Sequence, residues 1–373
     1  MALKVLMVGG RRCGKTSALA VMFEQMISGA TNEFFTVSDS TKYETKGNET
    51  QDTLTKKSTE LKMFLEKPNT KTFLVDSAPT NSDWKYKCKL NIPGTTKALE
   101  IVYTDVPGEW FRSGTYDEEI NRNVAEHDVF VVMVDTPYLM ETSESMCDAV
   151  NCISDIHTAL THINNNEGKS AKMVVFVPIK CEKWVKEGRI KEVTDKIKVA
   201  YRTPIKALMA YKKMTICILP IETAGNILFR EYKEAFLLNG NSPKDRCCQL
   251  SDKMVRMADG STKPLRANDV LNPDPDAVMG TLGIMRPYAW YYTNNKSETP
   301  GYVPRNCDQL ALHILKFYVQ KCQMEDAWGP IIGTIFGRWV ITKEEMLRKM
   351  AEINAANIIK NDVDGIEYIK KAY

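Results

Sequence analysis

Short apolar runs recur along the first two thirds of the chain, and segments with helical periodicity separate them. The runs cover residues 3–8, 129–134, 173–177 and 215–219. Runs of this length are typical of strands that are covered on both faces, as in a parallel sheet. The helical segments cover about 15–28, 141–163 and 183–212, the last of them broken at Pro204. This alternation predicts an α/β fold with a doubly wound, mostly parallel sheet.

A different pattern, between the first two runs, predicts an antiparallel hairpin. Residues 84–92 alternate between apolar and polar side chains, and residues 98–103 form a second strand-like segment. Pro93 and Gly94 lie between them and are typical turn residues. We therefore expect one antiparallel hairpin strand at the edge of the sheet.

Two long segments do not fit the alternation and are expected to be insertions. Residues 31–75 are rich in Thr and Lys, although apolar positions recur at the spacing of an amphipathic helix around Leu54, Ser58, Leu61 and Leu65. Residues 240–305 are rich in Pro, Gly, Asp and Asn. Their aromatic cluster at 288–292 fits either strand packing or a partner surface.

The C-terminal third is expected to complete one large domain and to add an appendage. A helix is predicted over about 307–322, with apolar residues stacked on one face. The spacing Thr342-x-x-Glu345 is that of a capping box, which predicts a helix to about residue 357. We expect one domain over residues 1–325 and a helical appendage over residues 326–373.

The strongest chemical signal is a glycine-rich loop directly after the first apolar run. Residues 9–16 read Gly-Gly-Arg-Arg-Cys-Gly-Lys-Thr and stand between a predicted strand and a predicted helix, which is the context of a phosphate-binding loop. Glycine lets backbone N–H groups surround phosphates, and the helix N-terminus adds partial positive charge. Lys15 is expected to reach the β- and γ-phosphates, and Thr16 to bind Mg²⁺. The expected nucleotide-binding residues of this segment are Gly9, Arg11, Arg12, Cys13, Gly14, Lys15, Thr16 and Ser17.

A second motif follows the hairpin, where residues 105–109 read Asp-Val-Pro-Gly-Glu. A carboxylate at the carboxyl end of a strand beside the phosphate loop can hold Mg²⁺, so Asp105 is a candidate metal ligand. The backbone N–H of Gly108 is expected to approach the γ-phosphate. The alternative is an ordinary Pro-Gly turn.

Taken together, the phosphate loop and a hairpin that ends in Asp-x-x-Gly resemble the Ras-like (TRAFAC) class of GTPases. The sequence of residues 105–109, together with Pro-Ile-Lys-Cys-Glu at 178–182, resembles motifs of the bacterial double-GTPase families of conflict and signalling systems. The resemblance covers residues 3–225 and the helix near 307–322, and it implies a P-loop GTPase domain. Glu109 stands where Ras-like proteins carry the glutamine that orients the attacking water.

The resemblance also suggests how the base is read. In the family, guanine is recognised by Asn-Lys-x-Asp, and here the corresponding residues are Ile179, Lys180, Cys181 and Glu182. Lys180 is expected to pack along the base, and the Glu182 carboxylate to accept hydrogen bonds from guanine N1 and N2. The sequence departs from the pattern where Ile replaces Asn and Glu replaces Asp, and a solvated charged pair is the alternative. Two further residues resemble the family's base-contacting loop, namely Thr223 and Ala224.

A threonine ahead of the hairpin is the next expectation that the resemblance implies. Pro79-Thr80 resembles the pair that closes over the γ-phosphate and Mg²⁺. Thr70 and Thr72 are alternatives, and Thr80 could also be an ordinary loop threonine. The expected metal ligands are therefore Thr16, Thr80 and Asp105.

One arginine of the phosphate loop is a candidate for catalysis. Arg12 falls where guanylate-binding proteins and atlastins place an arginine that turns inward on dimerisation. Such a residue would offset negative charge in the transition state, and it would imply a nucleotide-dependent homo-oligomer. The alternative is that Arg11 and Arg12 point to solvent or pair with acidic residues. The expected catalytic residues are Arg12, Glu109 and Thr80.

Composition limits the partners and the cellular location that we expect for this protein. The formal net charge of +3 is small against 50 basic and 47 acidic residues, and the basic stretch 183–213 lacks interleaved aromatic residues that would favour nucleic acid. Because the phosphate loop begins at Gly9, we expect no cleavable leader, and no run is long enough to span a membrane. Cysteine spacing indicates neither disulfides nor a structural metal. We expect a cytoplasmic protein.

These patterns favour a GTP-hydrolysing molecular switch that uses Mg²⁺ and presents its nucleotide state to protein partners. Two other functions remain open at this point. One is a nucleotide-binding scaffold or sensor with little hydrolysis, and the other is an ATP-dependent enzyme such as a kinase.

Overall fold

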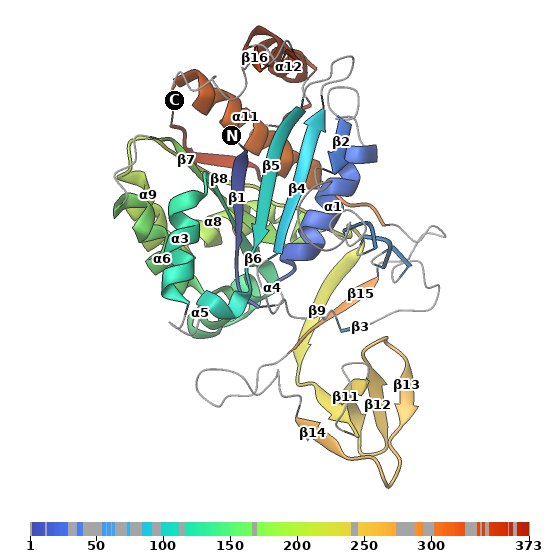
Figure 1. The fold of residues 1–373 in the computed structure, drawn as a ribbon. Helices are drawn as coiled ribbons and strands as arrows, with labels where there is room; N and C mark the ends of the chain where they lie inside the picture. Colours follow the sequence, from blue (N-terminus) through green and yellow to red (C-terminus); the bar gives the residue numbers. More distant parts are fainter. Residues whose placement is uncertain are drawn as a thin grey trace.

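The computed structural model describes residues 2–11, 13–28, 36–39, 54–56, 58–60, 62–63, 73–74, 84–91, 98–111, 116–165, 170–239, 245–273, 288–293, 302–324, 334–335, 338–339, 343–356, 358–360 and 364–372. Its centre is an eight-stranded sheet (Figure 1). In spatial order the strands are β18 (Glu367–Lys370), β8 (Met214–Ile218), β7 (Lys172–Ile179), β6 (Val129–Asp135), β1 (Leu3–Val8), β5 (Ala98–Asp105), β4 (Trp84–Asn91) and β2 (Thr36–Asp39).

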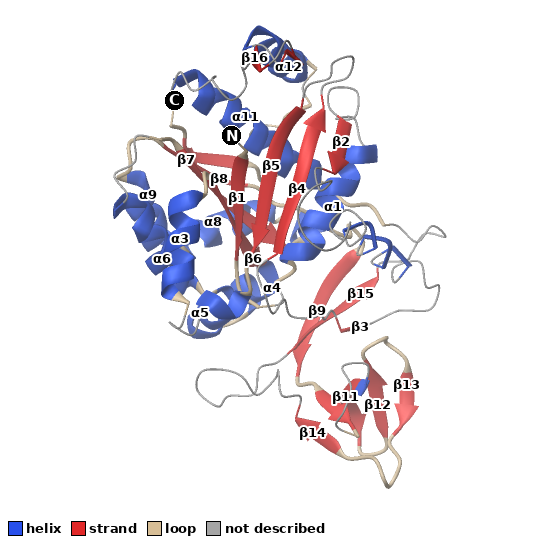
Figure 2. Ribbon diagram, in the orientation of Figure 1, coloured by secondary structure: helices blue, strands red, loops and turns tan. Residues whose placement is uncertain are grey.

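The five central strands are parallel. β1 lies between β5 and β6, and β6 continues through β7 to β8 in the same direction. Because parallel neighbours need crossover connections, helices lie on both faces of the sheet (Figure 2). The expected doubly wound, mostly parallel α/β fold is confirmed.

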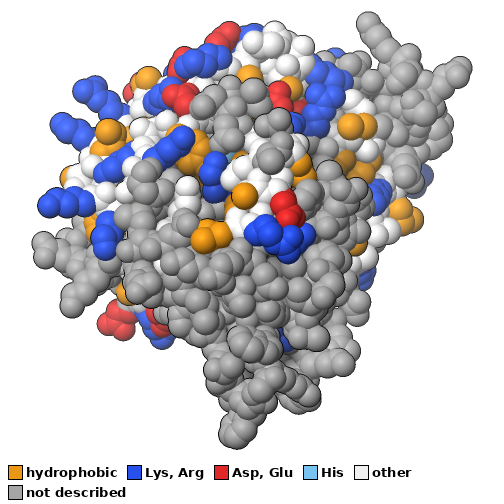
Figure 3. Space-filling model, turned by 90° about the horizontal axis from the view of Figure 1, so that it is seen from above, with side chains coloured by type: hydrophobic (Ala, Val, Ile, Leu, Met, Phe, Trp, Pro, Cys, Tyr) orange, Lys and Arg blue, Asp and Glu red, His pale blue; other side chains and the backbone are white. Residues whose placement is uncertain are grey.

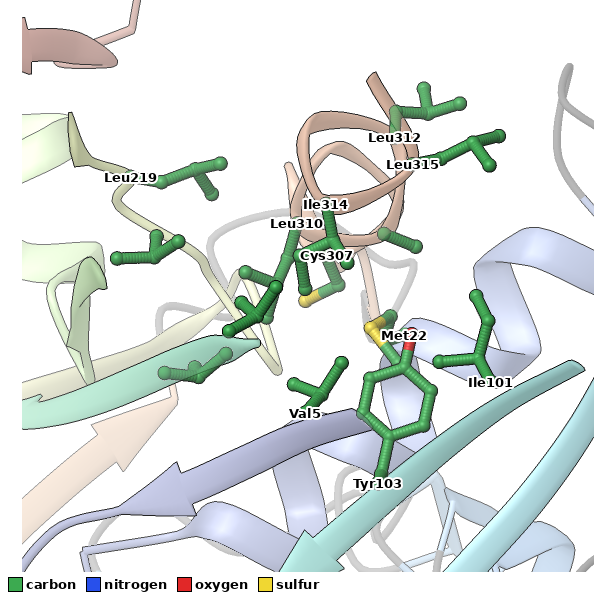
Figure 4. Close-up of a cluster of buried hydrophobic side chains, with 14 of the residues drawn as sticks. Val5, Met22, Ile101, Tyr103, Leu219, Cys307, Leu310, Leu312, Ile314 and Leu315 are labelled. Carbon is green, nitrogen blue, oxygen red and sulfur yellow. The ribbon is translucent and has the colours of Figure 1, made fainter. Parts of the chain in front are cut away.

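Residues of β1 alternate between two cores, one on each face of the sheet. Val5 and Met7 pack with α1 (Lys15–Ser28) and α11 (Cys307–Met324), as Figure 4 shows for Val5 beneath α11. Leu6 and Val8 face the second core. The helices that pack on that face include α3 (Asp117–Glu126), α6 (Ile153–Asn165), α8 (Ile190–Ala200) and α9 (Arg202–Met209). Full burial of one such side chain contributes about 1.5–3 kcal/mol, so β1 is fixed firmly from both faces.

The edges of the sheet differ from the expectation of a single antiparallel strand. β4 pairs antiparallel with β5 along its whole length, as the alternation predicts. However, β2 pairs antiparallel with the outer side of β4. The edge of the sheet is therefore β2 and not the hairpin of β4 and β5. At the other edge β18 pairs antiparallel with β8. Strands of only four residues carry too little alternation to be recognised in the sequence.

The last strand also corrects the expected helical appendage over residues 326–373. Helix α12 (Lys343–Ala355) is present, and two short strands, β16 (Thr334–Ile335) and β17 (Arg338–Trp339), pair ahead of it. The chain then returns to the main sheet as β18, where Lys370 donates hydrogen bonds to the carbonyls of Met209 and Tyr211. Among the described residues of this segment, β18 is therefore a strand of the main sheet.

The two long predicted helices are each divided. Residues 141–163 belong to α4 (Thr136–Glu141), α5 (Glu144–Asn151) and α6, with Cys152 in the left-handed region at φ +52° between the last two. Residues 183–212 belong to α7 (Glu182–Lys186), α8 and α9. The break expected at Pro204 lies at Tyr201, between α8 and α9. Pro204 itself lies in the first turn of α9, where its missing N–H costs nothing.

A β-rich insertion projects from the main domain (Figure 1). It begins with β9 (Ile227–Lys233), which pairs with β15 (Tyr288–Thr293), and β15 pairs in turn with β3 (Phe73–Leu74). Beyond β9 lies a five-stranded sheet with its own small core of Cys247, Val255 and Met257. Its strands are β10 (Phe236–Leu238), β11 (Arg246–Ser251), β12 (Met254–Met257), β13 (Thr262–Pro264) and β14 (Leu271–Pro273). We call β9, β15 and this five-stranded sheet the β arm.

Basic side chains of the stretch 183–213 are partly neutralised. Lys191 and Lys198 each pair with Asp195, and Arg189 pairs with Glu187 and Glu192. On the face drawn in Figure 3, Lys and Arg side chains are scattered among other residues. Among the described residues, no helix has the length and hydrophobicity needed to cross a membrane.

Candidate functional site

The candidate site lies at the carboxyl ends of four neighbouring parallel strands. The phosphate loop follows β1, Asp105 ends β5, Asp135 ends β6, and Lys180 follows β7. The register places Met7 beside Asp105 and Asp135 beside Ile179. Ligands of open α/β sheets bind at this edge, so residues far apart in the sequence meet where a ligand is expected.

The shape of the phosphate loop depends on glycine at two positions. At Gly10, a Cβ atom would lie 1.9 Å from the Val150 carbonyl oxygen of α5. Gly14 adopts φ +104°, a left-handed conformation that favours glycine. A Cβ at Gly14 would lie 3.3 Å from the Ile179 side chain, so Ile179, which replaces the family's asparagine, packs against the loop.

Lys15 lies across the phosphate loop. Its side chain is buried, and its Nζ donates hydrogen bonds to the carbonyl oxygens of Gly9 at 3.0 Å and Gly10 at 3.2 Å. Ser17 lies in the first turn of α1, half-buried, and Cys13 is buried beneath the loop. The ammonium group is therefore held at the loop.

Thr16 and Asp105, two of the expected metal ligands, lie next to each other. Thr16 Oγ1 donates a hydrogen bond to Asp105 Oδ2 at 2.7 Å. Asp105 is fully buried, and burial raises the pKa of its carboxyl, while Lys15 and Thr16 act in the opposite direction. Its second oxygen, Oδ1, is buried without a hydrogen-bond partner in the described part of the chain. A buried carboxylate with one unsatisfied oxygen beside a hydroxyl is a donor set that suits Mg²⁺.

The turn after β5 rests directly on the phosphate loop. A Cβ at Gly108 would lie 2.3 Å from the backbone nitrogen of Arg11 and 2.5 Å from the Gly10 carbonyl carbon. Glu109, in the 3₁₀ turn η2 (Gly108–Phe111), forms an ion pair with Arg11 at 2.6 Å. The structure thus pairs two predicted site residues with each other.

Lys180 is held by an acidic residue that the sequence analysis did not select. Its Nζ forms an ion pair with Asp135 Oδ2 at 2.6 Å, and its backbone adopts φ +56°. Asp135 is itself fixed, because its carboxylate accepts from Tyr138 N and its backbone N–H donates to Asn151 Oδ1 at 2.7 Å. A left-handed non-glycine residue costs on the order of 1 kcal/mol, which the surrounding contacts offset.

Glu182 lies at the start of α7 and is buried. Its Oε1 accepts from Ala224 N at 3.4 Å, and Thr223 lies half-buried in the same loop. Burial raises the pKa of the Glu182 carboxyl to about 7, the charge of Glu222 acts in the same direction, and backbone N–H groups of the loop oppose both. A carboxylate beside a strand end therefore faces residues 222–226. We call these residues the base loop, after the base-contacting loop that they are expected to form.

A segment far along the chain clamps this base loop. Glu222 and Arg305 exchange two backbone hydrogen bonds of 2.9 Å, and Val303 N donates to Ala224 O at 3.1 Å. At Gly225, with φ +77°, a Cβ would lie 2.0 Å from the Val303 carbonyl oxygen. The segment that leads into α11 therefore forms one side of the base loop, a contact that no local sequence pattern indicates.

Some expected residues lie outside the described part of the chain. Arg12 and Thr80 are among them, as are the alternatives Thr70 and Thr72. Asp135, which the sequence analysis missed, carried a signal of the same kind as Asp105, because it also ends a continuous apolar strand. Among the described residues, no group of three or more His, Cys, Asp or Glu side chains is arranged to hold a metal ion.

A protein-family model and two solved structures are similar to this chain. A family model described as Double-GTPase 2 matches residues 5–226. The GTPase-like domain of S. cerevisiae Ski7 bound to GTP is similar at 11% identity over 80% of this chain and 76% of that chain, with a TM-score of 0.36. The same domain bound to GDP and inorganic phosphate has a TM-score of 0.34 at 11% identity and the same coverage. At these TM-scores the similarity does not bear on function. Comparison with curated proteins gave no match.

Proposed function

The chain belongs to the Double-GTPase 2 family, and we propose that it is a GTP-hydrolysing molecular switch of the TRAFAC class that depends on Mg²⁺. The observation that carries the proposal is the convergence of Lys15, Thr16 and Asp105 at one edge of the sheet. We further propose that it acts in the cytoplasm of a bacterial defence or signalling system, with protein partners that bind one nucleotide state and with nucleotide-dependent self-association.

Phosphate binding is assigned to the loop and to Lys15. Backbone N–H groups of residues 9–16 surround the phosphates, and Lys15 exchanges its two carbonyl acceptors for phosphate oxygens. Thr16 and Asp105, with Thr80, would hold Mg²⁺. When bound, the ion supplies positive charge beside the β- and γ-phosphates.

Recognition of the base is assigned to the ends of β7 and β8. The aliphatic stem of Lys180 lies along the base, with its Nζ anchored by Asp135. The ionised Glu182 carboxylate accepts from guanine N1–H and N2–H₂, and the backbone at Thr223 and Ala224 closes the pocket. Adenine lacks this pair of donors, so a carboxylate here selects guanine.

Hydrolysis is assigned to the turn that rests on the phosphate loop. A water attacks the γ-phosphorus, the bond to the β–γ bridging oxygen breaks, and GDP, phosphate and a proton are released. The Gly108 N–H donates to the γ-phosphate, and Glu109, held near the loop by Arg11, orients the water. Arg12 supplies positive charge to the bridging oxygen.

Calorimetry and phosphate release test this proposal on the full chain. With Mg²⁺ we expect GTP and GDP to bind more tightly than ATP, and phosphate to be released over multiple turnovers. Guanine-nucleotide binding without turnover supports a scaffold or sensor, and preference for ATP supports an ATP-dependent enzyme. Either result would contradict the proposed switch.

Replacing Asp135 with Asn is expected to weaken GTP binding about tenfold. The amide keeps the shape of the carboxylate but no longer pairs with the Lys180 ammonium, whose strained backbone then loses its anchor. A double-mutant cycle with Lys180→Met checks this by calorimetry, and the two effects should not add. Lys172→Met, at the opposite end of β7, is the control and should leave affinity unchanged. Additive effects would show that Asp135 does not act through Lys180.

Guanine-nucleotide affinity is expected to rise with pH up to about 7 and then to level off. The pKa of Glu182 in the fold is about 7, so below that pH the carboxyl is protonated and cannot accept from both guanine donors. At pH 6, about one unit lower, affinity should be roughly tenfold weaker. In the Glu182→Gln variant this part of the pH dependence should vanish. Both proteins are measured with the same nucleotide, so the contribution from titration of its phosphates cancels when the two are compared.

In the absence of nucleotide, the free energy of unfolding should change with pH in the direction opposite to that of guanine-nucleotide affinity. Because folding raises the pKa of Glu182, the native state binds more protons than the unfolded chain between about pH 4.5 and 7, and the free energy of unfolding falls as pH rises through that interval. Glu222→Gln is the matched control, since burial raises the pKa of Glu222 to about 7 as well, with Arg305 and Lys186 opposing the rise. Because the charge of Glu222 raises the pKa of Glu182, Glu222→Gln should keep the pH dependence of GDP binding but shift it to lower pH. If the dependence disappears in Glu222→Gln, it belongs to Glu222 and not to Glu182.

A further inference from the structure

The β arm joins the main domain at the base loop, which ends where β9 begins. Asn226 is the last residue of the loop and Ile227 the first of β9. Lys186 of α7 donates a hydrogen bond from Nζ to Asn226 Oδ1 at 3.2 Å. No flexible linker separates the guanine-facing loop from the arm, so a rotation of β9 also moves the loop.

An aromatic cluster fixes β9 to the two helices that follow the nucleotide-facing strand ends. Phe229 stacks on Trp184 of α7, with ring centroids 6.0 Å apart and planes inclined by 17°. Tyr232 packs on Tyr138 of α4 at 4.8 Å and on Phe229 at 4.9 Å. α7 begins at Glu182, and α4 follows Asp135 directly. The same cluster that positions the arm therefore positions both base-reading elements.

The arm also pairs with the segment that carries the expected switch threonine. In β15, Trp290 and Tyr291 pair with Leu74 and Phe73 of β3. Thr80 stands six residues after Leu74 in the sequence. One three-stranded sheet, β3–β15–β9, thus joins the stretch before Thr80, the base loop and the projecting five-stranded sheet.

Resting on the proposed function, we propose that the β arm is the regulatory element of the nucleotide site. Its position depends on the nucleotide through β3 and the base loop, and displacing it opens the base pocket and speeds nucleotide release. Linkage requires this coupling to be reciprocal: nucleotide shifts the arm, and whatever holds the arm shifts nucleotide affinity. The aromatic residues Trp184 and Phe229 are positioning residues in this scheme, because they touch the base-reading elements and not the nucleotide.

Phe229→Ala in the full chain tests the proposal. Removing the ring breaks the stack on Trp184, and release of a fluorescent GDP should accelerate at least about fivefold, the lower end of typical coupling between sites. Phe229→Leu, which keeps apolar volume without a stacking ring, should be intermediate. Ile163→Ala, a truncation of similar burial in α6, should lower the melting temperature without changing the release rate.

Hydrogen–deuterium exchange supplies a second readout. With GDP and with a non-hydrolysable GTP analogue, amides of β9 and β15 should exchange at different rates in the wild-type chain, and this difference should be lost in Phe229→Ala. Identical exchange of the arm in both nucleotide states, with both nucleotides bound, would overturn the proposal while leaving the GTPase assignment intact. Failure of the wild-type chain to bind either nucleotide would instead overturn the proposed function.

Discussion

Replacing Lys15 with Ala is expected to weaken binding of GTP and GDP by at least 100-fold. In the structure, the Lys15 ammonium is buried and donates only to the carbonyls of Gly9 and Gly10 among its described hydrogen bonds. Phosphate oxygens carry charge and are stronger acceptors than carbonyls, and each charge-assisted hydrogen bond contributes about 1.5–3 kcal/mol. Loss of two such bonds corresponds to a decrease in affinity of about 10²–10⁴-fold, measurable by calorimetry with Mg²⁺ present.

The control for this variant lies on the preceding strand. Lys4 of β1 is half-exposed and pairs with Glu126 at 3.0 Å, so Lys4→Ala removes a lysine from the same part of the chain without touching the loop. We expect it to leave nucleotide affinity within about twofold, because exposed ion pairs contribute little. If Lys15→Ala binds GDP as tightly as the wild type, with an unchanged melting curve, the loop does not bind phosphate.

The central fold could be predicted, and candidate residues of the phosphate loop could be selected, because their signals are local. The strands around Val5, Phe130 and Val174 are continuous apolar runs, since both faces of each are covered. The phosphate loop needs glycine where the backbone leaves no room for a Cβ, as at Gly10. Such constraints are visible in a single stretch of sequence, so β1, β6 and β7 were predicted, and Thr16 and Asp105 were selected as candidate metal ligands. The direct hydrogen bond between these two residues was not predicted.

Contacts between distant segments could not be predicted in the same way. Nothing around residue 305 indicates that Arg305 pairs with Glu222, because the partners are separated by the whole β arm. The strand β18 is four residues long, and its sequence shows neither the helical nor the strand periodicity of apolar residues. It is a strand because it pairs with the open edge of β8. Asp135 was visible in the sequence, but its partner Lys180 is 45 residues away, and the ion pair exists only because β6 and β7 are neighbours.

Gly108→Ala is expected to lower the rate of GTP hydrolysis at least about 100-fold while GDP affinity stays within about threefold. The added Cβ would lie 2.3 Å from Arg11 N and 2.5 Å from the Gly10 carbonyl carbon, and both are backbone atoms that cannot rotate away. The loop is braced on its other sides by Val150 and Ile179, so the turn after β5 must move instead. Its N–H then leaves the γ-phosphate, and the loss of one such donor costs about 10²–10³ in rate.

Single-turnover phosphate release and GDP calorimetry on the same preparation separate these two effects. Gly188→Ala is the control, because this surface glycine has φ +68° but no atom within 4 Å of an added Cβ, so it introduces backbone strain without a clash at the site. Glu109→Gln separates the contribution of the Glu109 carboxylate from that of the Gly108 N–H, since it breaks the ion pair with Arg11 but leaves the backbone of the turn in place. If Gly108→Ala hydrolyses GTP at the wild-type rate, the turn after β5 does not contact the γ-phosphate during the reaction. If it loses GDP affinity as well, the clash distorts the phosphate loop, and the loop is less firmly braced than the contacts of Gly10 and Gly14 indicate.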